Sequence, residues 1–290
     1  MDAAIRESRD PAGRSFQDPN FDDSAWETVS LPHTFNDADL FATPIEDAGS
    51  AQKRTVAFYR NRLVIPPLYR AWRVILAFEG VRQACYVYVN GQLAGYYEMG
   101  VGPFGMDLTP YLSADGENCI AVAVDNTSTR NIAFCIAETP NKPDVMPGWY
   151  LQSQDEKVPA AREGTGFQWN CNDFNPTLGG LSHPVAVYLK PPVHLTLPLY
   201  ANLRSRGTYV YATDFSQEAH AASIHVEAEV RNTGTRPVSC AVRVSVETMD
   251  GRRLGSFASQ CCTVAPAAPD FLPEVTITPE DAYEWDAVEQ

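Results

Sequence analysis

Carboxylates are the most numerous side chains in this sequence that could do chemistry, since Asp and Glu supply 36 of its 290 residues. Two carboxyl groups held about 5 to 10 Å apart could act as acid and base on a glycosidic bond. Such a pair needs a rigid, deep pocket, as at the ends of barrel strands or in a cleft. With acids this plentiful, their number alone identifies no catalytic pair.

Other reactive side chains lack the spacing of a known catalytic or metal site. The sequence contains no G-x-S-x-G, H-E-x-x-H, P-loop or G-x-G-x-x-G motif, and its five histidines show no ligand-like spacing. Its seven cysteines are odd in number, scattered and without a C-x-x-C pair. We therefore expect no metal, no cofactor and no catalytic residue, and we predict free thiols in a reducing compartment. Cys261 and Cys262 are adjacent, so in a strand one of the two thiols is exposed.

The formal net charge of −14 excludes several classes of partner. Nucleic-acid recognition starts from clustered Lys and Arg, so we expect no nucleic-acid partner. The same charge disfavours an anionic membrane surface, and apolar runs such as 74–78 are far shorter than the roughly 20 residues of a membrane helix. The polar N-terminus has no apolar h-region, which predicts a cytoplasmic protein.

The elements that must position any site are predicted to be strands. Short runs in which β-branched and aromatic residues alternate with polar ones are bounded by Gly, Pro, Asn and Asp, whereas no window shows a clean helical stripe. Asn90-Gly91 between two such runs predicts a tight hairpin, because both turn positions need positive φ. The continuous apolar run 119–125 predicts a central strand buried on both faces. The remaining runs in this part of the chain cover 55–65, 72–79, 84–90 and 184–189.

A stiff Lys190-Pro191-Pro192 segment predicts a domain boundary, with domains at 1–192 and 193–290. Runs in the second domain, at 207–213, 222–231, 238–248 and 253–264, alternate with period two, which is typical of a two-sheet sandwich. The stretch 126–181 instead has little alternation and many Pro, Gly and lone aromatic residues. We predict that it forms an ordered loop that covers something.

Several short motifs follow one another along the first domain. They are 18–26 (DPNFDDSAW), 29–35 (VSLPHTF), 58–60 (FYR), 78–81 (FEGV), 87–91 (VYVNG) with Gly95, 103–104 (PF), 107–112 (DLTPYL), 118–126 (NCIAVAVDN) and 179–181 (GGL) leading into 185–189. This ordered set resembles the N-terminal sugar-binding domain of glycoside hydrolase family 2, which includes β-galactosidases, β-glucuronidases and β-mannosidases. The resemblance implies an all-β chain, a jelly-roll β-sandwich followed by a truncated immunoglobulin-like β-sandwich. Within it, Trp26 and Leu31-Pro32-His33 indicate a first strand.

The resemblance also implies substrate-binding residues. In that family an acidic residue, on a loop shortly before the glycine step, reaches into the pocket of a catalytic barrel and binds a sugar hydroxyl. Asp173 is the matching acid here, within Asn172-Asp173-Phe174-Asn175. A carboxylate suits this task because it accepts hydrogen bonds from two hydroxyls. Trp169 is a candidate for stacking on a pyranose face.

The family's catalytic glutamates lie in a barrel that follows these two domains, and the acid/base directly follows an asparagine. This chain contains no Asn-Glu dipeptide and ends with YEWDAVEQ inside the second domain. We therefore expect the non-catalytic N-terminal part of a retaining, β-galactosidase-like enzyme that hydrolyses O-glycosyl bonds. Its partners would be a carbohydrate and the catalytic barrel of the same polypeptide, and we expect the chain alone to be inactive. Two alternatives remain open: a stand-alone carbohydrate-binding or adhesive β-sandwich protein, and a scaffold that assembles through an unfinished sheet edge.

Overall fold

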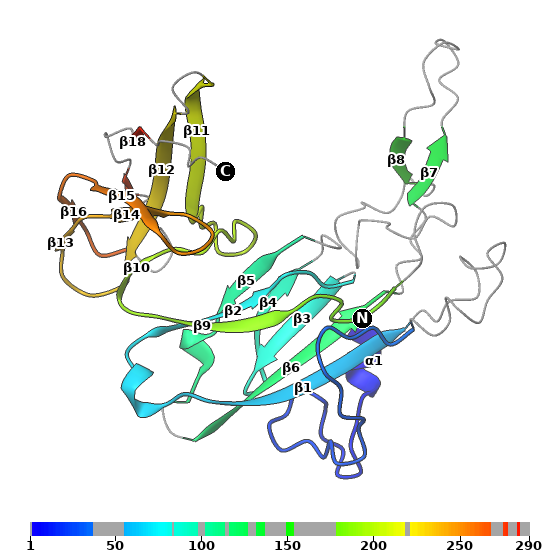
Figure 1. Cartoon of the computed structure of the whole chain (residues 1–290). Helices are drawn as coiled ribbons and strands as arrows, with labels where there is room; N and C mark the ends of the chain where they lie inside the picture. Colours follow the sequence, from blue (N-terminus) through cyan, green and yellow to red (C-terminus); the bar gives the residue numbers. More distant parts are fainter. Residues whose placement is uncertain are drawn as a thin grey trace. The chain divides into compact units, whose positions relative to one another are not determined.

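The computed structural model consists almost entirely of strands (Figure 1). It describes residues 2–36, 55–82, 84–97, 102–113, 116–126, 132–136, 149–153, 178–217, 221–267, 275–277 and 283–284. Its chain forms two compact units, one made of Met1–Arg70 with Ile75–Tyr188 and the other of Ala71–Val74 with Leu189–Gln290. The domain limits 1–192 and 193–290 remain a prediction. In the described part of the chain, no helix is long and apolar enough to cross a membrane.

A four-stranded antiparallel sheet forms the centre of the first unit. Its order is β1-β6-β3-β4, with β1 at Val56–Val64, β6 at Glu117–Asp125, β3 at Ala84–Val89 and β4 at Gln92–Tyr97. Strand β6 is buried from Asn118 to Asp125, which confirms the expected central strand. Asn90 and Gly91 join β3 to β4 with φ of 51° and 83°, which confirms the expected hairpin turn.

A three-stranded sheet of order β5-β2-β9 completes the sandwich of the first unit, with β5 at Phe104–Asp107, β2 at Arg73–Phe78 and β9 at Val185–Lys190. Aromatic stacking joins the two sheets. The ring of Phe104 on β5 lies 3.7 Å from that of Tyr97 on β4 and 4.6 Å from that of Phe78 on β2. Short 3-10 turns at Pro67–Tyr69 and Thr109–Tyr111 lead from one strand to the next. Both sheets therefore bury apolar side chains in one core.

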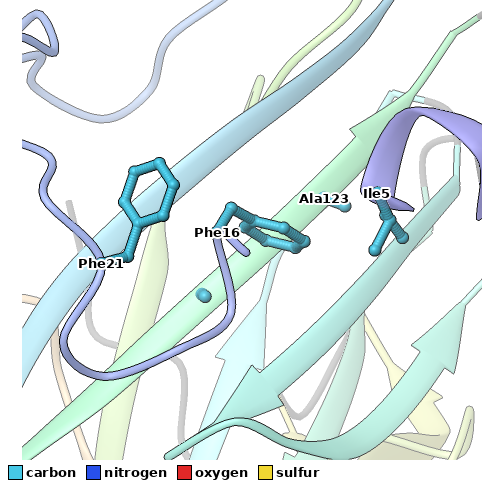
Figure 2. Packing of buried hydrophobic residues seen from close by; sticks show 5 residues of the cluster. Ile5, Phe16, Phe21 and Ala123 are labelled. Carbon is cyan, nitrogen blue, oxygen red and sulfur yellow. The ribbon is translucent and has the colours of Figure 1, made fainter. Parts of the chain in front are cut away.

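The outer face of the four-stranded sheet is covered by the N-terminal segment. Helix α1 (Asp2–Glu7) contributes Ile5, and the turns that follow contribute Phe16 and Phe21. Figure 2 shows these three side chains over Ala123 of β6. The first strand expected around Trp26 and Leu31–His33 is wrong, since residues 24–36 form turns and irregular backbone. Aromatic packing and side-chain hydrogen bonds, rather than a strand ladder, hold this segment on the sheet.

Part of the stretch 126–181 is regular, contrary to the expectation of a loop throughout. Strands β7 (Ile132–Ile136) and β8 (Trp149–Ser153) pair in antiparallel fashion over all five residues. Their sequences are rich in apolar and aromatic residues but too short to show a clear period.

The second unit is built around β12 (Ala221–Asn232), the longest strand described. Strands β10 (Val193–Leu195), β11 (Thr208–Ser216), β17 (Val275–Ile277) and β18 (Tyr283–Glu284) all pair with it. Residues of one phase of β12, Val226, Ala228 and Val230, are buried. The expected alternation holds only in part, because Glu229 of the opposite phase is also buried, where it accepts from the Arg206 N–H and pairs with Arg231.

Two long strands predicted in the second unit are each divided. The run 238–248 forms β13 (Val238–Cys240) and β14 (Arg243–Glu247), and the run 253–264 forms β15 (Arg253–Ala258) and β16 (Cys262–Val264). Strand β13 pairs with β16 and β14 with β15. Between the two pairs, the Val242 N–H donates to Ser259 Oγ at 3.0 Å and the Ser259 N–H donates to the Val242 carbonyl at 2.9 Å. A side chain thus takes the place of a backbone partner and interrupts both strands.

Candidate functional site

The three residues predicted to bind sugar, Trp169, Asn172 and Asp173, lie outside the described residues. The structure describes the chain again from residue 178, directly before Gly179-Gly180-Leu181, which we call the glycine anchor. The glycine anchor is the C-terminal attachment of the segment that carries the predicted site. Its surroundings therefore define the candidate functional site.

Residues 33–36 form the first wall of the glycine anchor. The His33 N–H donates to the Leu181 carbonyl at 2.8 Å, and the Phe35 N–H donates to the Gly179 carbonyl at 3.0 Å. The Gly179 N–H in turn donates to the side-chain oxygen of Asn36 at 2.9 Å. Since Asn36 is almost fully buried, this bond is protected from water. The N-terminal segment thus holds the anchor from one side by three hydrogen bonds.

Arg82 holds the other side of the anchor through its backbone. The N–H and carbonyl of Arg82 pair with the carbonyl and N–H of Gly180, both at 3.0 Å. The geometry requires glycine at this position, because Gly180 has φ of 137°, which side chains rarely adopt. A Cβ there would lie 2.5 Å from the His33 carbonyl oxygen and 2.8 Å from the Tyr59 hydroxyl.

Tyr59 of β1 contributes a buried polar group to the anchor. Its hydroxyl lies 2.9 Å from Nδ1 of His33, and the backbone N–H of Leu181 donates to the same oxygen. Burial raises the pKa of Tyr59 to about 12, although the Leu181 N–H acts in the opposite direction. The neutral hydroxyl can therefore donate to His33 while it accepts from Leu181, and it ties two chain segments together.

Asn126 joins two further segments at the same place. Its side-chain oxygen accepts the Thr55 N–H at 2.8 Å, and its own N–H donates to the Thr55 carbonyl at 3.3 Å. Its side-chain nitrogen also lies against Gly179, where an added Cβ would meet Asn126 Nδ2 at 2.6 Å and would collide with the Phe35 ring. Asn36, Thr55, Asn126 and Gly179, which are distant in the sequence, therefore meet at the glycine anchor.

The chemistry of the anchor is that of positioning. Asn36 and Asn126 bond to backbone groups, and the described residues include no group of three or more His, Cys, Asp or Glu arranged to hold a metal ion. The Tyr59 hydroxyl and His33 Nδ1 lie 2.9 Å apart, but the hydroxyl is largely buried, has a raised pKa and accepts from the Leu181 N–H, which fits a structural role. The anchor instead fixes the backbone of the segment that follows the predicted sugar-binding residues.

Sequence reasoning did not identify the roles of His33, Tyr59, Asn36 and Asn126. All four lie within or beside motifs read as core or turn, namely VSLPHTF, FYR and VDN. The sequence did contain a signal for these roles. Polar residues inside apolar motifs, and an Asn directly after a buried strand, need specific hydrogen-bond partners. Their partners lie 26 to 143 positions away in the sequence, and a single sequence does not show such contacts.

Comparison with known proteins identifies the family of the N-terminal part of the chain. The family described as "Glycosyl hydrolases family 2, sugar binding domain" matches residues 2–138. A β-glucuronidase from Formosa agariphila is 37% identical over 219 residues, which cover 74% of this chain and 19% of that protein. The chain belongs to glycoside hydrolase family 2. A β-galactosidase from Thermoanaerobacter pseudethanolicus is 36% identical over 114 residues, which cover 39% of this chain and 15% of that protein.

Solved family 2 structures share the fold. The structure of a β-glucuronidase from glycoside hydrolase family 2 matches with a TM-score of 0.72 and 31% identity over 94% of this chain, which is 25% of that protein. A Bacteroides uniformis β-glucuronidase shows the same fold with a TM-score of 0.63. The chain thus spans only 15% to 25% of the length of these relatives and corresponds to their N-terminal sugar-binding part. The predicted all-β sandwich fold and the predicted family are confirmed.

Proposed function

We propose that this chain is the non-catalytic N-terminal part of a family 2 enzyme that hydrolyses β-glycosides, either β-galactosides or β-glucuronides. The segment ahead of the glycine anchor contributes Asp173 to a sugar pocket that a catalytic barrel of the same polypeptide completes. The observation that carries this proposal is the family 2 sugar-binding domain in a chain that spans only 19% of its β-glucuronidase relative. Gly179, held on three sides, follows Asp173 by only six positions.

The anchor supports this role on physical grounds. A carboxylate that selects a sugar must hold its oxygens in place to within a fraction of an ångström, which requires rigid supporting contacts. The bonds from His33, Asn36 and Arg82 fix the backbone at the end of the segment. Trp169 and Asn172, in the same segment, are proposed to contact the sugar through a ring face and an amide.

The first test is the activity of the purified 290-residue chain. We expect it to show no turnover of chromogenic β-galactosides or β-glucuronides, since it would lack the paired carboxylates that this reaction needs. The full-length product of the same gene, assayed in parallel, is expected to hydrolyse at least one of the two. Turnover by the short chain at a comparable rate would overturn the non-catalytic role.

The second test replaces Asp173→Asn in the full-length product. Loss of hydrogen bonds to a charged acceptor is expected to lower kcat/KM by about 10- to 100-fold. Glu163→Gln is the matched control, because it removes a carboxylate from the same stretch of sequence and is expected to leave kcat/KM within about twofold. If both variants kept wild-type kcat/KM, Asp173 would have no role in the pocket.

A stand-alone carbohydrate-binding protein is the alternative that these tests separate. In that case the gene would end without a catalytic barrel, and the purified chain would bind immobilised glycans by itself. Binding that Trp169→Ala abolishes, together with a gene product of this size, would favour the alternative over the enzyme.

A further inference from the structure

Three cysteine side chains gather on one pair of strands in the second unit. In the pairing of β13 with β16, Cys240 lies directly opposite Cys262. Next to Cys262, the exposed Cys261 places its Sγ 3.1 Å from Ser239 Oγ of β13. All three are free thiols. Neither the fold nor the proposed sugar site accounts for this arrangement.

The two opposed thiols share one side of the strand pair. Both Cys240 and Cys262 pack against the buried cluster that contains Val242 and Val264. Directly opposed residues of antiparallel strands have Cα atoms about 4.5 to 5.5 Å apart, within the range of about 4.4 to 6.8 Å that disulfides span. The backbone of β13 and β16 therefore already holds these cysteines at bonding distance.

Cys240 is also in direct contact with Cys262. Burial raises the pKa of Cys240, and its charge interaction and side-chain hydrogen bond with Cys262, together with the charge interaction with Cys261, raise it further. Cys240 therefore remains a thiol and must lose its proton before it can attack, so it is assigned the second of two exchange steps.

We propose that Cys240 and Cys262 form an oxidation site that small-molecule disulfides close into a cross-strand disulfide. In the first step the Cys262 thiolate attacks one sulfur of the oxidant R–S–S–R, which breaks the S–S bond and releases R–S⁻. In the second step Cys240 gives its proton to solvent, attacks Sγ of Cys262 and releases the second R–S⁻. The two cysteines lose two electrons and two protons, and the oxidant is reduced to two thiols.

Cys261 is excluded from the bond by its place in the strand pair. It precedes Cys262 by one position, so its side chain projects to the opposite face, where it meets Ser239. A bond between adjacent cysteines would also need a strained eight-membered ring. The proposal therefore assigns Cys261 no part in the cross-link.

The test exposes the native chain to oxidised glutathione and then maps the peptides by mass spectrometry. We expect one cross-link, between the peptides of Cys240 and Cys262, with the intact mass lower by two hydrogens. The buried Cys85 and Cys119 serve as internal controls that report any unfolding, and mapping separates products at Cys135 and Cys171. Closing the loop should raise the melting temperature of the second unit by at least about 5 °C, reversibly with dithiothreitol.

Two variants make the result decisive. Cys240→Ser should trap Cys262 as a mixed disulfide with one glutathione, and its melting curve in reducing buffer shows whether it folds. Cys261→Ser should form the Cys240–Cys262 cross-link as wild type does. A cross-link that contains Cys261, a native chain that keeps both thiols, or a cross-link that appears only after Cys85 becomes reactive would overturn the proposal.

Discussion

Tyr59 and Arg60 are neighbours in sequence that do separate work on the two faces of β1. Side chains alternate across a strand, so one of them meets the glycine anchor and the other the N-terminal segment. Tyr59 contacts His33 and Leu181, whereas Arg60 contacts the turns around Phe16 and Asp18. The FYR motif on β1 therefore holds the glycine anchor on one face of the sheet and the turns around Phe16 and Asp18 on the other.

Replacement of Tyr59→Phe removes the hydroxyl and leaves the buried Leu181 N–H without its acceptor. We expect the free energy of unfolding to fall by about 1 to 3 kcal/mol, measured in urea. Tyr209→Phe is the control, since Tyr209 is 62% exposed and its loss of a hydroxyl should change stability by less than about 0.5 kcal/mol. Equal effects of the two substitutions would contradict the role of Tyr59.

The pKa of Tyr59 predicts a further difference at alkaline pH. Burial raises this pKa from 10.0 to about 12, so the folded state holds the proton that the unfolded state loses first. The stability that Tyr59 contributes is complete below pH 10.0 and is lost as pH rises toward about 12. Burial also raises the pKa of Tyr97, so phenolate absorbance during a pH titration should show at least these two tyrosines ionising late, and Tyr59→Phe should reduce the late absorbance change by one tyrosine.

Gly180→Ala tests the need for glycine in the anchor. The new Cβ would meet backbone atoms at 2.5 and 3.0 Å with φ of 137°, so we expect a loss of at least about 3 kcal/mol in urea unfolding. Gly13→Ala is the matched control, because Gly13 also has positive φ, 77°, but nothing within 4 Å of an added Cβ. Gly13→Ala should lower the free energy of unfolding by about 1 kcal/mol. A smaller loss at Gly180 than at Gly13 would contradict the packing argument.

At the scale of elements, Arg60 fastens the N-terminal segment to β1. Its guanidinium donates to the Asp23 carboxylate at 2.7 Å and to the carbonyls of Phe16, Asp18 and Pro19, and it lies 5.2 Å from the Phe21 ring centre. Its side chain is only 2% exposed. A planar fork of donors is needed to reach several acceptors at once, which an ammonium group does not supply.

Arg60→Lys should therefore release the segment while it keeps the charge. We expect a loss of about 2 to 4 kcal/mol and faster proteolysis between residues 10 and 26. Arg62→Lys is the comparison two positions on, because the ion pair of Arg62 with Glu117 is 3.5 Å long and exposed and its one bond to the segment is to the Pro19 carbonyl, at 3.0 Å. That substitution should cost less than about 1 kcal/mol and raise the proteolysis rate much less than Arg60→Lys. Equal protease sensitivity in both variants would show that Arg60 does not hold the segment.

The elements show where single-sequence reasoning succeeded and where it failed. The hairpin at Asn90-Gly91 and the central strand β6 were predicted because their signals, positive-φ residues and an unbroken apolar run, are local. The breaks at Val242 and Ser259 were not predicted, because they depend on a hydrogen bond between residues 17 positions apart. The N-terminal segment was misread for the same reason, since Arg60, distant in sequence, replaces its strand ladder.

For the candidate site, family motifs located the segment but not its attachment. Asp173, Asn172 and Trp169 were proposed from the resemblance and stay predictions. The glycine anchor was noted only as a sequence step, although its φ of 137° and its contacts with Asn36 and Asn126 explain why two glycines stand there. Those contacts join positions 143 and 53 apart, which is beyond the reach of any periodicity.

At the scale of the whole molecule, the net charge of −14 favours protonation of titratable side chains and so raises their pKa values. Nearby cations can lower the pKa of a particular side chain instead. Burial lowers the pKa of His194 below 6.5, and the cations Lys190, Arg231 and Arg73 lower it further, against the pull of the Pro191 carbonyl, 2.6 Å from Nδ1. The unfolded chain then takes up this proton before the folded one. The stability of the second unit is therefore expected to fall as pH drops below 6.5.

His194→Gln should flatten that decline, because glutamine can still donate to Pro191 but does not titrate. The difference in slope between wild type and variant should be less than about 1.4 kcal/mol per pH unit, the limit for one proton. Urea unfolding between pH 5 and 8 measures it. A steeper decline in the variant than in wild type would give the wrong sign and refute the assignment.

The meeting of Asn36, Thr55, Asn126 and Gly179 at one place has a consequence for how such proteins diversify. The ends of the intervening segments are pinned to one another by bonds to the main chain, so the distance that each segment must bridge is set independently of its sequence. Since the entropy cost of closing a span grows only with the logarithm of its length, a change in the number of residues between these positions is expected to alter the stability of the sandwich little. Asn36, Thr55, Asn126 and Gly179 are therefore the positions at which we would join such spans from other family 2 proteins.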